Sequence, residues 1–406
     1  MRQAVVLVGG KGTRLGALTR ETPKPLLPID GDVRFLDYVL ENLARYGLEE
    51  ILLSAGHLGE QVEARYAGRS FGSTLLTVIR EPEPAGTGGA LRFLADRLDD
   101  RFMMLNGDSF FDFNYLALAQ DMEPDAIGLL ALRRVPDSGR YGGVDMDGSR
   151  IVAFREKDPD RGEGLISGGV YVLKREVLSY IQQTPCSLET DVFPVLAGQG
   201  QLYGREFDGY FLDIGIPDSL AQGRREMPDA TRRPAVFFDR DGTLNHDAGY
   251  THKPEDLAWT PGAIDAVRSV NDAGWLAVVV TNQAGVARGY YDEAAIDRFH
   301  RTMQQELARH GAHIDAFYHC PHHPEAVVDA YRHTDHPDRK PNPGMVLRAL
   351  AELPIKRERS VIIGDRDIDL DAGARAGIEG RLYEGGDLGT LVRAVLAEAR
   401  TAPEPA

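Results

Sequence analysis

The same pattern occurs at two places in the chain: a short apolar run is followed by a loop that contains glycines or aspartates. The first run covers residues 4–8 and precedes a glycine-rich loop; the second covers residues 235–238 and precedes two aspartates. After each opening, apolar runs alternate with segments of helical period. This pattern predicts strands alternating with helices, and hence a parallel sheet. We therefore expect two α/β folds in succession.

The length of the chain agrees with two folding units. At 406 residues it exceeds the roughly 150 residues of an ordinary domain. A charged segment that contains Pro228 and Pro234 separates the two alternations, which is typical of a linker. We predict a first domain at residues 1–227, a linker at 228–233 and a second domain at 234–400.

Net charge, the length of apolar runs and the number of cysteines argue against several classes of function. The 62 Asp and Glu residues outnumber the 46 Lys and Arg residues, and the net charge of -16 argues against nucleic acid as a partner. No apolar run reaches the 18 or so residues that span a bilayer, and residues 4–8 are too few for a signal peptide core. Cys186 and Cys320 fall in different predicted domains, so no disulfide framework is expected. These features predict a cytoplasmic protein without a membrane partner.

The first half carries glycine-rich loops at its predicted strand ends. The run GGKGTRLG at residues 9–16 lets backbone N–H groups approach a phosphate chain. It is neither a dinucleotide fingerprint, because position 15 is leucine, nor a P-loop, because Gly12 follows the lysine. Alone, the loop also fits a plain glycine turn. Its companions are TPKPLLP at 22–28, AGTGGA at 85–90 and Asp108 after a predicted strand, and together they favour a nucleotide site.

These motifs resemble those of the sugar-1-phosphate nucleotidyltransferases. The likeness extends to SGGVY at residues 167–171 and YFLDIGIP at 210–217. It implies a Rossmann-like fold with a mixed sheet, and attack of a sugar 1-phosphate on a nucleoside triphosphate with release of pyrophosphate. Val8 is a departure, since the family usually has alanine there.

The resemblance also implies roles for individual residues. Arg14 would hold the leaving pyrophosphate, Lys24 the α-phosphate, and Asp108 with Asp213 a Mg²⁺ ion. The nucleotide would contact Gly9, Gly10, Lys11, Gly12, Thr13, Gly86, Thr87 and Gly88. The sugar phosphate would contact Gly143, Glu156, Lys157 and Gly169. The run at 86–91, together with LETD at 188–191, is most similar to heptose-1-phosphate and mannose-1-phosphate guanylyltransferases, which favours GTP.

The second half begins with paired carboxylates, in FFDRDGTL at residues 237–244. In extended geometry Asp239 and Asp241 would point to one side. Such a pair suits phosphoryl chemistry, with one carboxylate as nucleophile, the other as acid and then base, and Mg²⁺ offsetting their charge. Further polar motifs are TNQ at 281–283, RKP at 339–341 and GDRDID at 364–369.

These four motifs resemble the haloacid dehalogenase superfamily of phosphatases, which implies a Rossmannoid fold. By this resemblance Asp239 forms the aspartyl phosphate and Asp241 is the acid and base. Thr281 and Lys340 would bind phosphoryl oxygens. The Mg²⁺ ion would be held by Asp239, Asp241 and Asp365, with Asp369 in support.

Within that superfamily, AGY at 248–250 and TNQAGVARG at 281–289 are most similar to D-glycero-D-manno-heptose 1,7-bisphosphate 7-phosphatase. Histidinol-phosphate phosphatase is a near relative, but its glutamine-rich segment is missing here. Asn282, Arg288 and Arg339 would contact the substrate, with Arg339 on the distal phosphate.

One loop departs from both relatives, which usually bind structural Zn²⁺ through two cysteine-containing pairs. Here CPH at 320–322 remains, and the second pair aligns with HPD at 336–338. Cys320, His322, His336 and Asp338 are all zinc ligands by type. A zinc site and a metal-free loop with solvated histidines both stay open.

Two catalytic sets on one chain predict a bifunctional enzyme of nucleotide-activated heptose synthesis. The phosphatase would act first, because the 1-phosphate left after removal of the 7-phosphate is the nucleophile that the transferase needs. Its small-molecule partners would be sugar phosphates and a nucleoside triphosphate. The alternatives are the same two reactions on histidinol phosphate and on mannose or another hexose 1-phosphate, or one half that only binds a sugar nucleotide.

Overall fold

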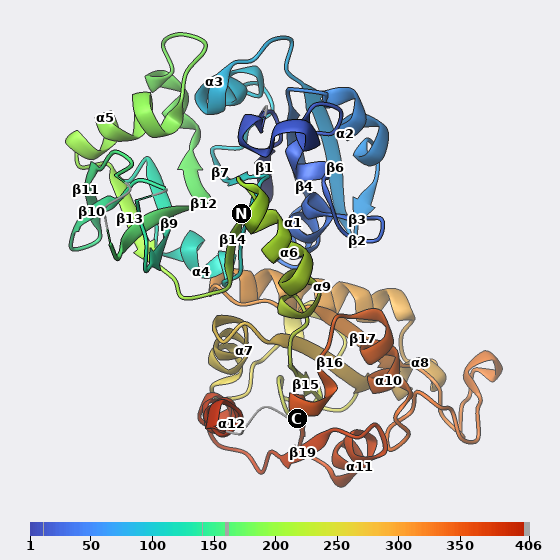
Figure 1. Ribbon diagram of the computed structural model, residues 1–406. Coiled ribbons are helices and arrows are strands. Elements are labelled where there is room, and N and C mark those ends of the chain that lie inside the picture. The colour runs from blue at the N-terminus through green and yellow to red at the C-terminus, as the bar shows by residue number, and fades with distance from the viewer. Residues whose placement is uncertain (11, 140, 159–161, 402–406) are drawn as a thin grey trace. The chain divides into compact units, whose positions relative to one another are not determined.

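The computed structural model describes residues 1–10, 12–139, 141–158 and 162–401 and divides into two compact units, Met1–Ala230 and Thr231–Ala406 (Figure 1). The first unit ends in helix α6 (Pro217–Ala230). Residues 228–230, which we expected in the linker, are therefore helical. Pro228 removes a backbone hydrogen bond from the last turn without ending the helix at that point.

The first unit is built on a ten-stranded mixed sheet. Its strands are β1 (Gln3–Leu7), β4 (Glu50–Ala55), β5 (Ser70–Phe71), β6 (Thr74–Arg80), β7 (Arg101–Asn106), β9 (Gly128–Val135), β10 (Val144–Asp147), β11 (Arg150–Phe154), β12 (Gly164–Lys174) and β13 (Leu202–Glu206). Their order is β10-β11-β13-β9-β12-β7-β1-β4-β6-β5. Two small sheets pair β2 (Pro28–Asp30) with β3 (Val33–Arg34), and β8 (Ser109–Phe111) with β14 (Phe211–Asp213).

Four predicted strands of this unit are confirmed as β1, β4, β6 and β7, which pair in parallel. Beyond β7 the sheet is mixed, because β12 runs antiparallel to both β7 and β9, whereas β9 and β13 pair in parallel. The mixed sheet that the family resemblance implied is therefore present. The helices are α1 (Phe35–Ala44), α2 (Gly59–Tyr66), α3 (Gly86–Phe93), α4 (Tyr115–Gln120), α5 (Phe193–Gly198) and α6, with a 3₁₀ segment η1 (Thr13–Thr19) after β1.

The second unit is a five-stranded parallel sheet with helices on both faces. Its strands are β15 (Ala235–Phe238), β16 (Leu276–Asn282), β17 (Ala316–Cys320), β18 (Val361–Gly364) and β19 (Glu379–Leu382), in the order β17-β16-β15-β18-β19. Its helices are α7 (Ala263–Asp272), α8 (Ala284–Ala287), α9 (Glu293–Arg309), α10 (Gly344–Glu352), α11 (Asp367–Arg375) and α12 (Leu388–Thr401). The predicted helix at 292–310 is confirmed as α9, capped by the Asp292 side chain.

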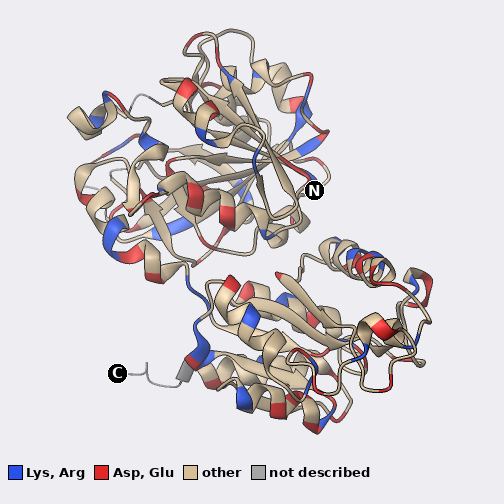
Figure 2. Ribbon diagram, turned by 90° about the vertical axis from the view of Figure 1, so that its right-hand side faces the viewer, with Lys and Arg blue, Asp and Glu red and all other residues tan. Residues whose placement is uncertain are grey.

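The central strand β15 shows why its sequence is apolar throughout. Val236 and Phe238 pack in a cluster with side chains of α7, α9 and α12, whereas Ala235 and Phe237 pack in a second cluster with α10. Alternate residues of a strand face opposite sides, so a sheet covered on both faces needs both sets apolar. Charged residues accordingly lie mainly on helices and loops (Figure 2). Within the described residues, no helix combines the length and apolar character needed to cross a membrane.

Candidate active sites

The candidate catalytic side chains of the second unit lie at the carboxyl ends of neighbouring strands of its sheet. Asp239 follows β15, Thr281 lies near the end of β16, and Asp365 follows β18. Strand β15 pairs in parallel with both β16 and β18, so the carboxyl ends of all three strands lie together. The Asp239 amide donates to the Ile363 carbonyl at 2.9 Å, which fixes Asp239 beside β18.

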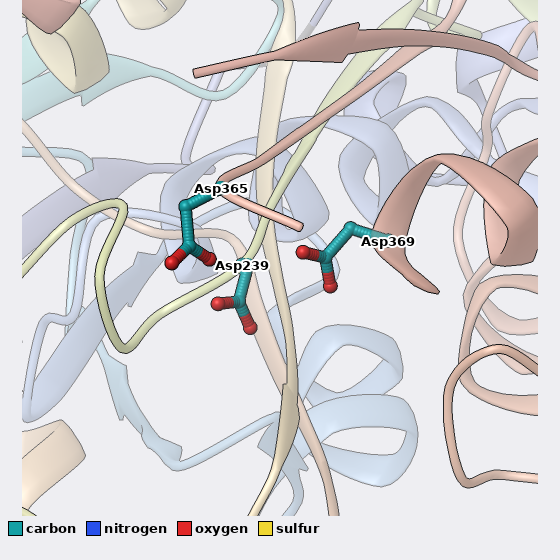
Figure 3. A group of neighbouring side chains, drawn as sticks. All are labelled: Asp239, Asp365 and Asp369. Carbon is teal, nitrogen blue, oxygen red and sulfur yellow. The ribbon is translucent and has the colours of Figure 1, made fainter. Parts of the chain in front are cut away.

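Three carboxylates meet at this edge. Ligand oxygens of Asp239, Asp365 and Asp369 lie within 4.8 Å of one another (Figure 3). Asp365 Oδ1 is buried without a hydrogen-bond partner. Gly242 has φ +92°, and a Cβ there would clash with the Asp365 carboxylate. Carboxylate oxygens are the ligands that Mg²⁺ prefers, and the unpartnered oxygen is one that a cation would satisfy. The triad therefore fits a divalent cation.

Lys340 lies buried against this triad. Its Nζ atom is 2.5 Å from Asp239 Oδ1 and 2.6 Å from Asp369 Oδ1, and it donates to the Val280 carbonyl at 2.7 Å. Burial alone would lower the pKa of Lys340, but the two carboxylates outweigh burial and raise it. Burial also raises the pKa of Asp239, to about 7, against the opposite effect of Lys340. One fixed cation thus offsets part of the charge that would repel a phosphate.

The Asp241 carboxylate lines the same cleft and accepts four hydrogen bonds. Arg240 donates to both oxygens at 2.9 and 2.8 Å, Asn245 donates to Oδ1 at 3.1 Å and Gln283 to Oδ2 at 2.7 Å. Asp369 joins Asp239 and Asp365 in the carboxylate group, and the role of Asp241 as a Mg²⁺ ligand stays a prediction. Strand β15 ends at Phe238, so the extended geometry assumed for both aspartates does not continue to Asp241.

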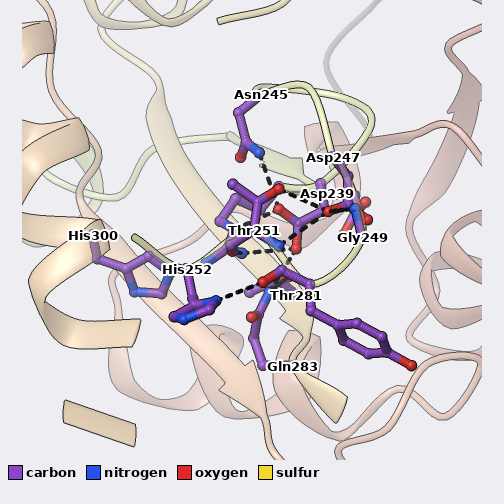
Figure 4. A network of polar contacts seen from close by, with 12 residues as sticks. Asp239, Asn245, Asp247, Gly249, Thr251, His252, Thr281, Gln283 and His300 are labelled. Carbon is purple, nitrogen blue, oxygen red and sulfur yellow. Dashed lines mark hydrogen bonds and ion pairs between the residues drawn. The ribbon is translucent and has the colours of Figure 1, made fainter. Parts of the chain in front are cut away.

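Arg240 is a buried residue to which the sequence analysis gave no role. Its side chain is 0 % exposed, lies over the Phe299 ring at 4.6 Å, and donates to the Thr251 carbonyl at 2.7 Å. It also contacts His300 Nε2 at 3.4 Å. Burial and the neighbouring arginine lower the pKa of His300 to about 2, so the neutral imidazole accepts this contact. Arg240 therefore links Asp241 to the loop that contains Thr251. Figure 4 labels Thr251 and His300, two of the residues that Arg240 contacts.

The catalytic edge opens into a cleft of about 660 Å³. Its lining includes every second-unit catalytic and substrate residue that we predicted, and adds cationic or aromatic side chains that we did not. The predicted residues are Asp239, Asp241, Thr281, Asn282, Arg288, Arg339, Lys340 and Asp365, and the additions include Tyr250, His323 and Arg366. Asn282 accepts from the Lys340 amide and donates to the Lys340 carbonyl, both at 3.1 Å. The cleft therefore combines an anionic floor with cations near it.

The predicted zinc residues are only partly assembled. Cys320 Sγ lies 3.7 Å from His336 Nδ1, and the rings of His322 and His336 stack with centroids 4.0 Å apart. The buried Nδ1 atom of His322 has no hydrogen-bond partner. Asp338, in contrast, pairs with Arg348 at 3.1 Å. Cys320 and His322 each contact His336, but among the described residues only the acidic triad of Asp239, Asp365 and Asp369 brings three ligand atoms within 4.8 Å of one another.

In the first unit, two glycine loops border a cleft of about 500 Å³. It is lined by the predicted residues Gly9, Gly10, Gly12, Thr13, Arg14, Lys24, Gly86, Thr87 and Asp108. Lys11 was also predicted there but lies outside the described residues. A Cβ on Gly86 would clash with the Cys186 carbonyl, and Gly88 has Cys186 Sγ 2.9 Å from the place of a Cβ. Glycine is therefore required for α3 to begin against Cys186.

A lysine–carboxylate pair lies at the centre of this cleft. The buried Lys24 Nζ is 2.7 Å from Asp108 Oδ2. Asp213 lies on β14, opposite Ser109 of β8; its Oδ2 accepts from Ser109 Oγ at 3.2 Å and its Oδ1 from the Gly215 amide at 2.8 Å. Gly215 lines the cleft, whereas the Asp213 side chain is not part of the described lining. The two aspartates are thus joined through the β8–β14 pair.

The predicted sugar contacts divide into two groups. Gly143 and Gly169 are buried, and Gly169 adopts φ +74° with Asn106 Nδ2 3.2 Å from the place of a Cβ. Asn106 lines the cleft. Glu156 and Lys157 are exposed and are not part of the described lining. The structure therefore brings Gly169 near the cleft and leaves the charged pair outside it.

Glu81 is a cleft residue that the sequence analysis missed. It follows β6 and lines the cleft. Its Oε1 accepts from Ser54 Oγ at 2.9 Å, and burial raises the pKa of the carboxyl. The signal that could have found it is the one used for Asp108, an acidic residue directly after a parallel strand. A carboxylate in a cleft otherwise suited to phosphates points to a ligand group with hydrogen-bond donors.

Comparison with known proteins divides the chain in the same way. Residues 3–229 match the Nucleotidyl transferase family, and residues 338–401 match a HAD-like hydrolase family. A D-glycero-beta-D-manno-heptose-1,7-bisphosphate 7-phosphatase of Rhodopseudomonas palustris is 44% identical over 43% of this chain and 96% of its own length. A D-glycero-alpha-D-manno-heptose 1-phosphate guanylyltransferase of Aneurinibacillus thermoaerophilus is 34% identical over 55% of this chain and 98% of its own.

A solved structure resembles the first unit. HddC from Yersinia pseudotuberculosis, complexed with GMP-PN, is 29% identical, with a TM-score of 0.50 over 56% of this chain and 100% of its own. The two sets of relatives cover opposite halves of the chain. A transferase fold and a phosphatase fold are therefore joined in one polypeptide.

Proposed function

The chain belongs to the nucleotidyl transferase family in its first half and to the HAD-like hydrolases in its second, and from that premise we propose that it performs two successive steps on one sugar. The second unit removes the 7-phosphate of D-glycero-D-manno-heptose 1,7-bisphosphate. The first unit then transfers a guanylyl group from GTP to heptose 1-phosphate. The observation that carries the proposal is one lysine–carboxylate site in each unit, in folds whose relatives act on consecutive heptose phosphates.

The phosphatase step uses Asp239 as nucleophile. Its oxygen attacks the phosphorus of the 7-phosphate, the bond from phosphorus to O7 breaks, and Asp241 gives its proton to O7. Water then attacks the aspartyl phosphate, Asp241 takes the proton of that water, and inorganic phosphate leaves. Lys340 and Thr281 hold the phosphoryl oxygens, while Arg240 orients Asp241. A Mg²⁺ held by Asp239, Asp365 and Asp369 would neutralise charge in this site.

Cations around the same cleft account for a substrate with two phosphates. Arg339 and Arg288 line the cleft with Arg366, and guanidinium groups bind phosphate by paired hydrogen bonds. These arginines hold the 1-phosphate while the 7-phosphate occupies the floor beside Asp239. Burial lowers the pKa of Arg339, but a guanidinium remains charged at physiological pH.

The transferase step needs no protein nucleophile, because the sugar 1-phosphate supplies one. Its oxygen attacks the α-phosphorus of GTP, the bond to the β-phosphate oxygen breaks, and pyrophosphate leaves. Lys24 stabilises the α-phosphate and Arg14 the leaving pyrophosphate. Asp108 and Asp213 would hold Mg²⁺, which neutralises the crowded phosphate oxygens. Gly9, Gly10, Gly12 and Gly86 give the nucleotide access to the backbone.

Glu81 supports guanine as the base. Guanine presents two adjacent donors, N1–H and the 2-amino group, whereas the corresponding edges of adenine and uracil alternate donors with acceptors. A carboxylate has acceptors only, so it pairs with both guanine donors and leaves an acceptor facing an acceptor with the other bases. The GMP-PN complex of the related HddC agrees with this choice.

We also propose a zinc ion in the loop after β17. The contacts of Cys320 and His322 with His336, and the unpartnered His322 Nδ1, support this proposal. These three side chains would have to move closer together to hold zinc, and Asp338 would have to release Arg348 to become the fourth ligand. Metal analysis of the purified protein is expected to give one zinc per chain, and Cys320→Ser to lower it. Less than about 0.2 equivalents would contradict a tightly held structural ion.

Substrate panels test the proposed function. Phosphate release is measured with heptose 1,7-bisphosphate and with histidinol phosphate, and pyrophosphate release with heptose 1-phosphate and mannose 1-phosphate, each sugar as both anomers. The expected result is a higher kcat/KM for the heptose substrate in each pair. Higher values for histidinol phosphate or mannose 1-phosphate would assign the two sites to other substrates. An inactive half would make that unit a binding module.

A further inference from the structure

Tyr250, which lines the phosphatase cleft, has an unfavourable backbone conformation and a partly exposed side chain. Neither property is expected of a residue that only stabilises the fold. Its φ is +62°, in the left-handed region that favours glycine and is unfavourable for a tyrosine. The side chain is 39% exposed, so little burial offsets that unfavourable conformation. Strained residues of this kind gather at ligand sites. A glycine at position 250 would remove the strain, and yet the chain places a large ring there.

The surrounding loop imposes this conformation through a dense set of hydrogen bonds. Asp247 Oδ1 accepts from the Gly249 amide at 3.0 Å, from the Thr251 amide at 3.1 Å and from Thr251 Oγ1 at 2.9 Å. The Tyr250 carbonyl contacts His252 Nδ1 at 2.7 Å, and the Thr251 carbonyl accepts from Arg240. Asp247, Gly249, Thr251 and His252 of this loop are labelled in Figure 4. The loop therefore holds its rim position whether or not the tyrosine ring makes core contacts.

A second exposed aromatic ring supports the first. Tyr290, beyond α8, is 60% exposed, and its ring lies edge-on to the Tyr250 ring with centroids 5.0 Å apart. Tyr290 is not part of the described cleft lining, whereas Tyr250 is. Tyr290 thus packs on the outer side of the pair and restricts where the Tyr250 ring can lie. Two large exposed rings from separate segments form a ready surface for an apolar ligand face.

The other side chains that line the cleft indicate which class of ligand would bind there. The floor accepts a phosphoryl group beside Asp239 and Lys340, and arginines line the same cleft. The face of the Tyr250 ring, which lines the same cleft, suits the part of a ligand that carries C–H bonds. A sugar ring presents such a face, and the substrate of the proposed function contains one between its phosphates.

We propose that Tyr250 binds the C–H face of the sugar ring of the bisphosphate substrate, with Tyr290 as the residue that positions it. This inference rests on the proposed function and deepens it, because it names a contact that separates sugar bisphosphates from small phosphate esters. A glycine at position 250 would remove the backbone strain but would also remove the ring that contacts the sugar. This trade-off accounts for a tyrosine in a strained conformation.

The test compares Tyr250→Gly, Tyr250→Phe and Tyr290→Ala in the full-length enzyme. For each, KM is measured with heptose 1,7-bisphosphate and with acetyl phosphate, which has no sugar, and thermal unfolding is followed in parallel. The KM for heptose 1,7-bisphosphate divided by the KM for acetyl phosphate is the KM ratio. Tyr250→Gly is expected to raise this KM ratio about tenfold. The unfolding temperature should not fall, because glycine accepts the positive φ. Tyr250→Phe restores the ratio to within about twofold, and Tyr290→Ala gives an intermediate value.

Two results would overturn the inference. The first is a Tyr250→Gly enzyme that unfolds at a lower temperature with an unchanged KM ratio, which would make the ring structural. The second is an equal rise in KM for both substrates, which would place the effect at the phosphate. If the unsubstituted enzyme itself fails to release phosphate from heptose bisphosphate but cleaves acetyl phosphate, the proposed function falls and this inference falls with it.

Discussion

The two units place a buried lysine against carboxylates at the carboxyl ends of parallel strands, but they differ in how many carboxylates gather. Among the residues that the structure describes, Lys24 of the first unit forms its ion pair with Asp108, at 2.7 Å. Lys340 of the second unit touches Asp239 and Asp369, with Asp365 beside them. The first site faces a cleft bordered by glycine loops, whereas the second has an anionic floor.

The difference follows from the source of the nucleophile. In the transferase the attacking oxygen belongs to the sugar phosphate, so the protein needs only to hold phosphates and leave room for a nucleotide. In the phosphatase the protein supplies the attacking oxygen, so it must keep a carboxylate beside a phosphate that it would otherwise repel. Lys340 offsets part of that charge, and the further carboxylates would hold a divalent cation that offsets more of it.

The largest expected effect comes from removing the protein nucleophile. Asp239→Asn should lower phosphate release by about 10⁴-fold or more and leave pyrophosphate release from supplied heptose 1-phosphate unchanged. Parallel assays of the two products on the same preparation check this. Loss of both activities in a folded protein would break the comparison, because it would mean that the two sites are not separate.

The reciprocal change should be smaller, because Lys24 stabilises charge and does not react. Lys24→Ala is expected to lower nucleotidyl transfer by about 10²–10³-fold, with phosphatase kinetics as in the unsubstituted enzyme. Steady-state kinetics of both reactions measure it. A transferase that keeps its full rate would show that the Lys24–Asp108 pair is structural.

Base choice should respond to Glu81. Glu81→Gln is expected to reduce the preference for GTP over ATP by about 10–100-fold, since an amide offers one acceptor where the carboxylate offers two. Glu83→Gln, an exposed neighbour on the same loop, is the matched control. Competition assays with both nucleotides report the ratio, and equal ratios in the two variants would remove Glu81 from base recognition.

The same carboxylate gives a pH signature. Burial raises the pKa of Glu81, and only its ionised form accepts both guanine donors. The kcat/KM for GTP should therefore fall as pH drops through this raised pKa and stay level above it. Glu81→Gln should abolish that acidic limb. An identical limb in the variant would assign the titration to another group.

The smallest effect on activity is expected from matched core substitutions. Leu52→Ala in the first unit and Leu307→Ala in the second replace fully buried side chains. Each should lower the free energy of unfolding of its own unit by about 2–5 kcal/mol. Heat inactivation of each activity separates the two effects, and a parallel loss of both activities from either change would indicate a single cooperative structure.

Much of the fold could be predicted from the sequence. Apolar runs followed by polar residues located β1, β4, β6, β7, β15, β16 and β18, because parallel strands buried on both faces need apolar side chains throughout. The antiparallel pairs on one side of the first sheet were expected only from the family resemblance. Strand order and direction depend on contacts between distant segments, which a local pattern does not contain.

The sites were predicted less evenly, for identifiable reasons. Asp241 was placed with Asp239 by assuming an extended chain, but β15 ends before both residues. Both side chains nevertheless line one cleft, where Arg240 donates to Asp241. Asp369 joins the carboxylates through α11, which no spacing rule relates to β15. Glu81 gave the same strand-end signal as Asp108 but lies outside the glycine-rich runs. Glu156 and Lys157 are exposed, and their roles stay predictions.

The central claim is that one chain carries out both steps in order. Phosphorus NMR of the full-length protein with Mg²⁺, heptose 1,7-bisphosphate and GTP tests it in one tube, with ATP in place of GTP as the control. The account predicts that inorganic phosphate appears first, followed by pyrophosphate and the resonances of a diphosphate-linked sugar. Inorganic phosphate without any diphosphate-linked sugar, with either anomer of the heptose, would contradict it.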